Sequence, residues 1–214
     1  MECMNGKCGI LIFAEQEDGE IHKVTYELLG KGREIADRLG KNLCAVLLGY
    51  NLEDKAWELI YYGADKVFLF DHPSLEDFDA VRYKHNIVKL VNEIKPDILL
   101  IGATRVGRSL APRIAASLKT GLTADCVDLD VDEEGSLIQI RPAFSGNIMA
   151  RIKTRTRPQM ATVRYRIMKP LNRDPARKGE VVKMKPEIIE NTGTKILEKR
   201  RADEVNISDA EIIV

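Results

Sequence analysis

Short apolar runs alternate with longer amphipathic stretches along the first half of the chain. Residues 8–14 (CGILIFA) are almost entirely apolar, which is typical of a strand buried on both faces of a parallel sheet. Residues 24–39 place apolar side chains near helical spacing and stop at Gly40, a residue suited to a helix C-terminus. The first unit is therefore predicted to be a strand followed by a helix.

The same alternation continues further along the chain. It predicts strands at residues 42–49, 66–70 and 97–102, and helices at residues 53–62 and 78–94. Strands joined by helices of this length pair in parallel through right-handed crossovers. The fold class predicted is α/β, a doubly wound three-layer sandwich with a mostly parallel sheet. A closed barrel of eight such units would need a longer chain.

Beyond Gly121 the predicted strands follow one another without helices between them. They cover residues 125–131, 136–141, 147–154 and 159–163 and are separated by acidic or glycine-containing turns. Consecutive strands joined by short turns pair in antiparallel fashion. We therefore expect an antiparallel β extension of the sheet.

The composition changes again at residues 169–179 (KPLNRDPARKG), which are rich in basic residues and turn formers. We accordingly divide the chain into an N-terminal α/β domain with its β extension over residues 1–168, a linker with additional strands over 169–205, and the start of a further domain over 206–214. The last segment contains DAEIIV, an apolar run that normally opens a strand. The additional strands are predicted at residues 180–189 and 196–205.

Charge and hydropathy limit the classes of partner. The chain has 33 basic and 33 acidic residues, so it has no net charge that would attract nucleic acid or an anionic membrane. Its longest apolar stretches, such as residues 98–103, are far shorter than the roughly 20 residues that span a bilayer. The first residues, MECMNGKCG, lack the apolar core of a signal peptide. A cytoplasmic protein is expected.

Neither cysteines nor histidines form a recognised chemical motif. Cys44 and Cys126 lie in apolar strand-like segments and are expected to be buried thiols, whereas Cys3 and Cys8 are expected in a frayed terminus. No CxxC, HExxH or GxSxG motif occurs. No metal ligand or general base is therefore assigned.

The segment GATRVGRS at residues 102–109 joins a predicted strand to a predicted helix. Ser109 is the expected N-cap of that helix, and its free backbone N–H groups could hold a phosphate. Only Gly102 and Gly107 are present, however, which matches neither a Walker loop nor GxGxxG. The alternative is that the glycines only make the turn and the arginines face solvent. The residues that would form the phosphate cradle are Thr104, Arg105, Gly107 and Ser109.

The segment RPAFSGNIMARI at residues 141–152 interrupts a strand pattern without resembling a polar loop. An exposed Phe144 beside Arg141 and Asn147 would suit a protein interface or a flat aromatic ligand. Equally, Phe144 could belong to the core, with Gly146 at a bulge. A period-two series of basic residues follows and could face an acidic partner, a phosphate or solvent. It comprises Arg151, Lys153, Arg155, Arg157, Arg164 and Arg166.

GATRVGRSLAPRIAASLKTGLTADC, RPAFSGNIMARI and RPQMATVR together resemble the alpha subunit of electron-transfer flavoproteins, and the resemblance extends along the chain from Gly9. It implies an N-terminal domain with an adenine-nucleotide-hydrolase-like fold and a C-terminal domain that binds FAD and opens with DAEIIV. FAD is then expected in the intact protein, bound mainly by that second domain, with none on this chain alone. The implied role is an electron carrier between dehydrogenases, or NADH, and an acceptor oxidoreductase, and not a catalyst on its own, although some members split electron pairs.

The resemblance also implies a heterodimer with a beta subunit. In the beta subunit the site corresponding to GATRVGRS holds AMP or a second FAD, whereas the alpha copy generally holds none, so the cradle here would be degenerate. Arg141, Phe144 and Asn147 would lie towards the beta subunit and the space where flavins exchange electrons. The alternative is a freestanding adenine-nucleotide-binding module of the universal-stress-protein type. An ATP pyrophosphatase is disfavoured because AEQEDG at residues 14–19 is acidic where a glycine- and serine-rich loop is needed.

Overall fold

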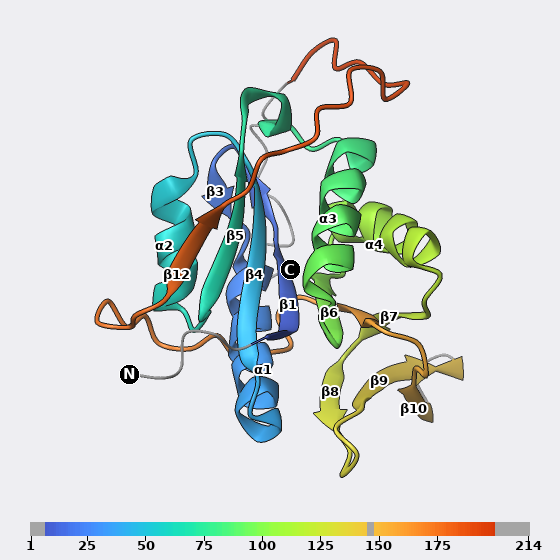
Figure 1. The fold of residues 1–214 in the computed structure, drawn as a ribbon. Helices are drawn as coiled ribbons and strands as arrows, with labels where there is room; N and C mark the ends of the chain where they lie inside the picture. Colours follow the sequence, from blue (N-terminus) through green and yellow to red (C-terminus); the bar gives the residue numbers. More distant parts are fainter. Residues whose placement is uncertain (1–6, 145–147, 200–214) are drawn as a thin grey trace, which may run out of the picture.

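The structure, a computed structural model, describes residues 7–144 and 148–199. Its largest element is a seven-stranded sheet in the order β12-β5-β4-β1-β6-β11-β7, whose neighbouring strands run parallel (Figure 1). Helices cover both faces, which confirms the predicted three-layer fold. The strands are β1 (Cys8–Ala14), β4 (Asn42–Gly49), β5 (Lys66–Asp71), β6 (Ile98–Gly102), β7 (Leu122–Cys126), β11 (Gln159–Val163) and β12 (Glu180–Lys183). The helices are α1 (Lys23–Leu39), α2 (Glu53–Tyr61), α3 (Ala80–Ile94) and α4 (Arg105–Leu118).

Strand β1 divides the core into two layers because its side chains alternate between the faces of the sheet. Ile10 and Ile12 pack with α1 and α2, whereas Leu11 and Phe13 pack with α3 and α4. Every residue of β1 is buried. This double burial explains why the strand is a continuous apolar run instead of an alternating one.

The helix ends follow the capping chemistry of the sequence. The side chain of His22 accepts a hydrogen bond from Val24 N at the start of α1, and Gly40, with φ of 60°, ends that helix. Asp79 caps α3 by accepting from Val81 N and Arg82 N.

The strand order reverses at β1, which lies between β4 and β6. The carboxyl ends of β1 and β6 therefore form the topological switch point, where doubly wound proteins bind ligands.

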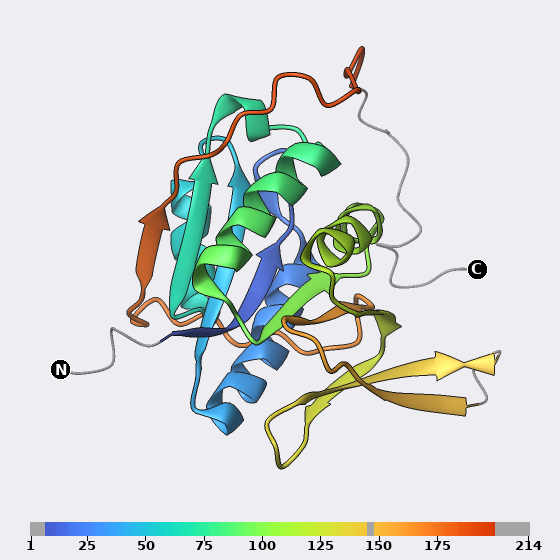
Figure 2. The same cartoon turned by 45° about the vertical axis from the view of Figure 1, so that its right-hand side comes forward.

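Strand β11 corrects one sequence-based prediction. Residues 159–163 were expected among the antiparallel strands, but β11 lies inside the main sheet, parallel to β6 and β7. All of its residues are buried, as an interior parallel strand requires. The other three strands form a separate antiparallel sheet in the order β10-β9-β8, which we call the arm. It comprises β8 (Asp128–Val131), β9 (Leu137–Ala143) and β10 (Ile148–Lys153) and projects from the helical body at the lower right of Figure 2.

After β11 the chain crosses the face of α1 and returns to the far edge of the sheet. The buried carboxylate of Glu27 accepts hydrogen bonds from the backbone N–H groups of residues 166–168 at 3.0–3.3 Å. A Cβ at Gly30 would lie 2.2 Å from Lys169 O, so only glycine admits the crossing chain there. Strand β12 then pairs with β5. The domain boundary after residue 168 stays a prediction, although β12 belongs to the same sheet as β1.

Strand β12 is shorter than the predicted strand over residues 180–189. No strand forms over residues 196–199, and the rest of the strand predicted at 196–205 lies outside the described residues, as does the segment 206–214. The thiols of Cys44 and Cys126 are buried, as predicted. Cys8 is buried in β1 instead of lying in a frayed terminus, and Cys3 lies outside the described residues.

Across residues 7–144 and 148–199, no helix is long and apolar enough to cross a membrane.

Candidate functional site

Helix α4 begins directly after β6, and its N-cap is Thr104. Thr104 Oγ1 accepts a hydrogen bond from Gly107 N at 3.0 Å. The expected N-cap, Ser109, lies within the helix instead, and its hydroxyl accepts from Arg113 at 3.0 Å. The prediction for Ser109 was therefore wrong. Threonine and serine are both good N-caps, so residue type alone did not separate the two positions.

Gly107 allows α4 to start unusually close to the end of β6. A Cβ at this position would lie 1.8 Å from Gly102 O, well inside van der Waals contact. Gly107 therefore has a packing role, bringing the first turn of the helix against the strand, as glycines do in dinucleotide-binding turns.

A carboxyl group of the chain itself lies at the predicted phosphate cradle. Thr104 Oγ1 donates to Glu15 Oε2 at 2.6 Å, and both residues are buried. Glu15 follows β1, so the contact joins the two strand ends at the switch point. Burial raises the pKa of Glu15, because desolvation disfavours the charged form. The Thr104 hydroxyl is thus already paired with an acidic side chain of the chain itself, so the residues present do not favour a bound nucleotide phosphate.

Of the other predicted cradle residues, Arg105 is exposed and Gly107 is buried. The part of the chain that the structure describes contains no cluster of three or more His, Cys, Asp or Glu side chains that could hold a metal ion.

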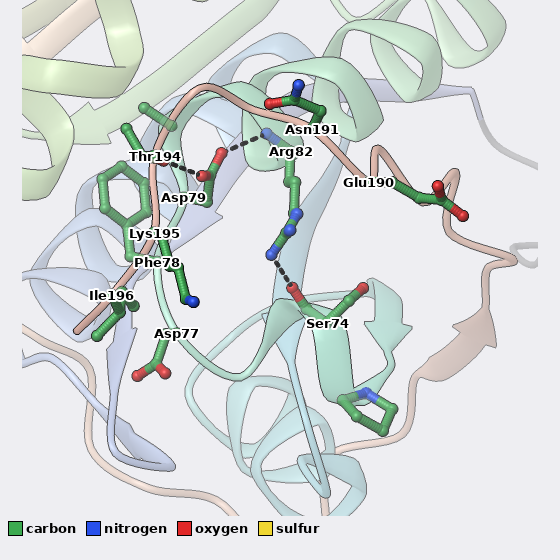
Figure 3. A pocket seen from close by; sticks show the side chains of 12 residues that line it. Ser74, Asp77, Phe78, Asp79, Arg82, Glu190, Asn191, Thr194, Lys195 and Ile196 are labelled. Carbon is green, nitrogen blue, oxygen red and sulfur yellow. Dashed lines mark hydrogen bonds between the residues drawn. The ribbon is translucent and has the colours of Figure 1, made fainter. Parts of the chain in front are cut away.

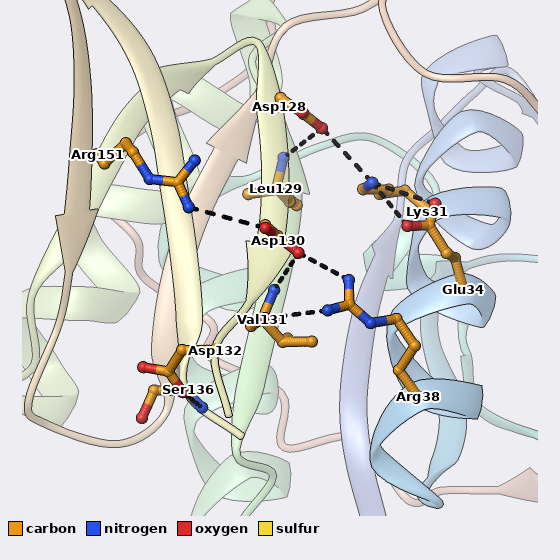
Figure 4. A network of polar contacts seen from close by, with 10 residues as sticks. All are labelled: Lys31, Glu34, Arg38, Asp128, Leu129, Asp130, Val131, Asp132, Ser136 and Arg151. Carbon is orange, nitrogen blue, oxygen red and sulfur yellow. Dashed lines mark hydrogen bonds and ion pairs between the residues drawn. The ribbon is translucent and has the colours of Figure 1, made fainter. Parts of the chain in front are cut away.

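The arm is attached to α1 by a network of ion pairs (Figure 4). Asp130 on β8 lies 2.7 Å from Arg38 of α1 and 3.8 Å from Arg151 of β10. Arg38 also donates to Val131 O at 3.1 Å. Its hydrogen bond to Asp130 lowers the pKa of that carboxyl. One carboxylate therefore links the helix to two strands of the arm.

Two buried glutamines join the arm to the main sheet. Gln139 Oε1 accepts from Thr123 Oγ1 at 2.7 Å and from Thr154 Oγ1 at 3.2 Å, while Gln139 Nε2 donates to Met160 O at 3.0 Å. Gln159 accepts from Leu137 N at 2.7 Å and donates to Thr154 O at 2.6 Å. A movement of the arm would break these hydrogen bonds and leave buried polar groups unpaired, which is costly. The two glutamines therefore fix the position of the arm relative to the main sheet.

The far end of the arm exposes apolar side chains. Phe144, Ile148 and Met149, which we call the arm tip, are 81%, 53% and 52% exposed. Ile148 pairs with Ala143, and Met149 pairs with Pro142, so the tip joins the ends of β9 and β10. Arg141, on β9, is half-buried, and Asn147 lies outside the described residues. The structure thus favours the exposed alternative for Phe144 over the core alternative.

Four of the residues described above were not predicted as functional: Ile148, Met149, Gln139 and Glu15. Ile148 and Met149 are adjacent apolar residues and so break the alternation of apolar and polar positions in β10, which was an available signal. Glu15 lies in the acidic segment 14–19 noted above, but its contact with Thr104 spans 89 positions of sequence, so no local pattern indicated that contact.

A cavity of about 690 Å³ lies between α3 and residues 190–196 (Figure 3). Asp79 accepts from Thr192 at 2.7 Å and Thr194 at 2.9 Å, and Arg82 donates to Ile189 O at 3.0 Å. These contacts hold the extended segment against the helix. A second cavity, of about 370 Å³, lies beside His85 and Glu187. Of the predicted site residues that the structure describes, none lines either of these two cavities.

The fold and site define a doubly wound α/β domain in which a buried glutamate is hydrogen-bonded to the N-cap of α4, and in which an antiparallel arm ends in an exposed apolar tip. Residues 10–188 match the family described as electron transfer flavoprotein domain, and the chain belongs to this family.

Relatives match nearly the whole chain. The electron transfer flavoprotein subunit alpha of Thermoanaerobacterium thermosaccharolyticum is 48% identical over 99% of this chain and 65% of its own length. Subunit LctC of the lactate dehydrogenase (NAD(+),ferredoxin) of Acetobacterium woodii is 44% identical, covering 96% of this chain and 50% of its own length. Protein FixB of Clostridium saccharobutylicum is 48% identical, covering 96% and 63%. The chain thus spans between half and about two thirds of the length of these curated relatives.

Proposed function

We propose that this chain is the scaffold and partner-binding part of an electron-transfer flavoprotein alpha subunit, paired with a beta subunit in a heterodimer. The observation that carries this proposal is the exposed apolar arm tip on a firmly attached base, in a chain similar to alpha subunits along its length. Exposed aromatic and aliphatic side chains held on a rigid element are typical of interface anchors. The intact protein would carry electrons between a dehydrogenase, or NADH, and an acceptor oxidoreductase in the cytoplasm.

FAD is proposed as the cofactor of the intact protein, bound mainly by residues outside this chain. The position of Glu15 supports a degenerate cradle, because its carboxyl group accepts the Thr104 hydroxyl where a phosphate would bind. When bound, the flavin would supply the electron-accepting and electron-donating chemistry. The residues of this chain would hold the partner subunit and orient it.

The first test concerns partner binding. Phe144→Ala combined with Arg141→Ala should weaken the heterodimer, because it removes the most exposed anchor of the arm and a neighbouring charge. We expect a loss of at least about tenfold in affinity for the beta subunit, measured by calorimetric titration. Trp57→Ala is the matched control, since Trp57 is a 39% exposed aromatic residue on α2, away from the arm. Unchanged affinity in the double variant would exclude the arm tip as the docking site.

The second test concerns the cradle. The ultraviolet-visible spectrum of the purified chain should show no flavin, and acid extraction should release no adenine nucleotide. Addition of the beta subunit and FAD should give a complex. The universal-stress-protein alternative requires retained ATP or AMP instead, so nucleotide released from the chain alone would favour that class.

A further inference from the structure

Two arginines contact one aspartate at the carboxyl edge of the main sheet. Arg164, directly after β11, donates to Asp125 through Nε at 3.2 Å and through an Nη at 2.6 Å. Arg108 of α4 lies 3.9 Å from the same carboxylate. Arg108, Arg164 and Asp125 are called the arginine cluster below.

The backbone holds Asp125 and Arg164 together. Asp125 has φ of 61°, and its N–H donates to Thr162 Oγ1 at 2.9 Å. Arg164 N donates to Cys126 O at 2.9 Å on the same pair of strands. The bidentate contact between the two side chains is therefore prepared by the pairing of β7 with β11. Arg108 is held far less tightly, since its side chain is 64% exposed and its contact with Asp125 is long.

The charges of the cluster do not balance. Two guanidinium groups face a single carboxylate, which leaves an excess of one positive charge within the cluster. The guanidinium fork matches the two oxygens of a carboxylate, and arginine is enriched in protein interfaces for this reason. The cluster is suited to acidic side chains brought by another molecule.

Its shape favours a protein over a small anion. The side chains of Arg108 and Arg164 are 64% and 42% exposed, and neither of the two cavities described above is lined by any arginine of the cluster. Arg141 lies on β9, three positions before Phe144 of the arm tip. The arginine cluster and the apolar arm tip would thus contact the same partner, as the polar rim and the apolar core of one interface.

We propose that the arginine cluster binds aspartate or glutamate side chains of the partner subunit, in competition with Asp125, the internal carboxylate that pairs with the arginines in the free chain. This inference rests on the proposed heterodimer. It adds that the surface of the partner facing the cluster is acidic.

The test compares three variants in calorimetric titrations with the beta subunit at low and at physiological salt. Arg108→Glu reverses a charge that is weakly held within the chain, and should reduce affinity about tenfold or more at low salt. Arg113→Glu is the matched control, because it makes the same charge change on an exposed residue of the same helix. Asp125→Asn should raise affinity, since it releases two arginines while asparagine tolerates the positive φ of this position. Melting temperatures would confirm that each variant is folded.

Opposite effects of Arg108→Glu and Asp125→Asn, both weakened by salt, would support the inference. Equal affinities of Arg108→Glu and Arg113→Glu, with Phe144→Ala still impaired, would overturn it and leave the heterodimer intact. Binding of inorganic pyrophosphate to the chain alone, lost in Arg108→Glu, would assign the cluster to a small anion and would also overturn it. Absence of any complex with the beta subunit would overturn the proposed function, and this inference with it.

Discussion

The main sheet and the arm are built from strands of similar length but opposite exposure. Every residue of β1 is buried between two layers of helices, whereas every residue of β10 is exposed or half-exposed. The sheet is stabilised by apolar contacts on both faces. The base of the arm is held by the buried side chains of Leu129, Val131 and Leu137 and by polar contacts, whereas its outer strand β10 has no buried residue. The difference indicates that stability is concentrated in the sheet, and that the arm is left free to present side chains.

The largest effect should come from a truncation within the sheet. Leu11→Ala removes a fully buried side chain of the central strand and should reduce the free energy of unfolding by about 3 kcal/mol, because the cavity cannot collapse between packed layers. Met149→Ala at the arm tip should cost about 0.5 kcal/mol or less. Urea denaturation followed by circular dichroism would measure both. Similar losses in the two variants would remove the distinction between the regions.

The next largest loss of stability should come from a substitution at the junction between the main sheet and the arm. Gln139→Leu keeps a side chain of similar size but leaves the Thr123 hydroxyl and the Met160 carbonyl without their partner. The substitution should therefore reduce the free energy of unfolding by about 2 kcal/mol. Hydrogen exchange should accelerate in β9 and β10 and stay slow in β1. If exchange increases equally in both sheets, the glutamine stabilises the whole domain instead of positioning the arm.

A smaller effect is expected where the arm meets α1. The lowered pKa of Asp130, caused first by its hydrogen bond to Arg38, means that its contribution to stability is present above the unfolded pKa and is lost as pH falls through the folded pKa. Asp130→Asn should cost less than about 1 kcal/mol near neutral pH, because the pair is largely exposed. The cost should vanish in acid and decrease with salt. Thermal melts at several pH values would show whether it does.

The smallest effect should come from the cradle. The raised pKa of Glu15, caused first by desolvation, gives a contribution that is fully present below the unfolded pKa and is lost as pH rises through the folded pKa. Glu15→Gln keeps an acceptor for Thr104 without a buried charge. The melting temperature of the variant relative to the wild type should therefore be higher at pH 8 than at pH 4. The same difference at both pH values would contradict a buried, perturbed carboxyl group.

The sequence predicted best what depends on neighbouring residues. Strands β1, β4, β5 and β6 and helices α1, α2 and α3 follow from local periodicity, and Gly40 marks the end of α1 as predicted, whereas the two-residue strands β2 (Gln16–Glu17) and β3 (Glu20–Ile21) were not predicted. Strand β11 was misplaced because its neighbours β6 and β7 come from distant segments. Local spacing indicated that Phe144 was unusual but left its exposure open. The position of Glu15 depends on a tertiary contact, so only the structure revealed it.

The arm leaves the main sheet at the end of β7 and returns at β11, the strand directly beside it. Because the two strands are parallel, with Cys126 opposite Val163 and Leu122 opposite Met160, the arm leaves at one end of this strand pair and returns at the other. Its two attachment points are therefore held by a rigid frame at a fixed separation of roughly 15 Å, about the length of the strands. For an insertion between fixed ends, each doubling of its length costs only about 0.6 kcal/mol of closure entropy. The arm can consequently be lengthened, shortened or exchanged as a module, so that the choice of partner can change while the sheet that carries it stays the same.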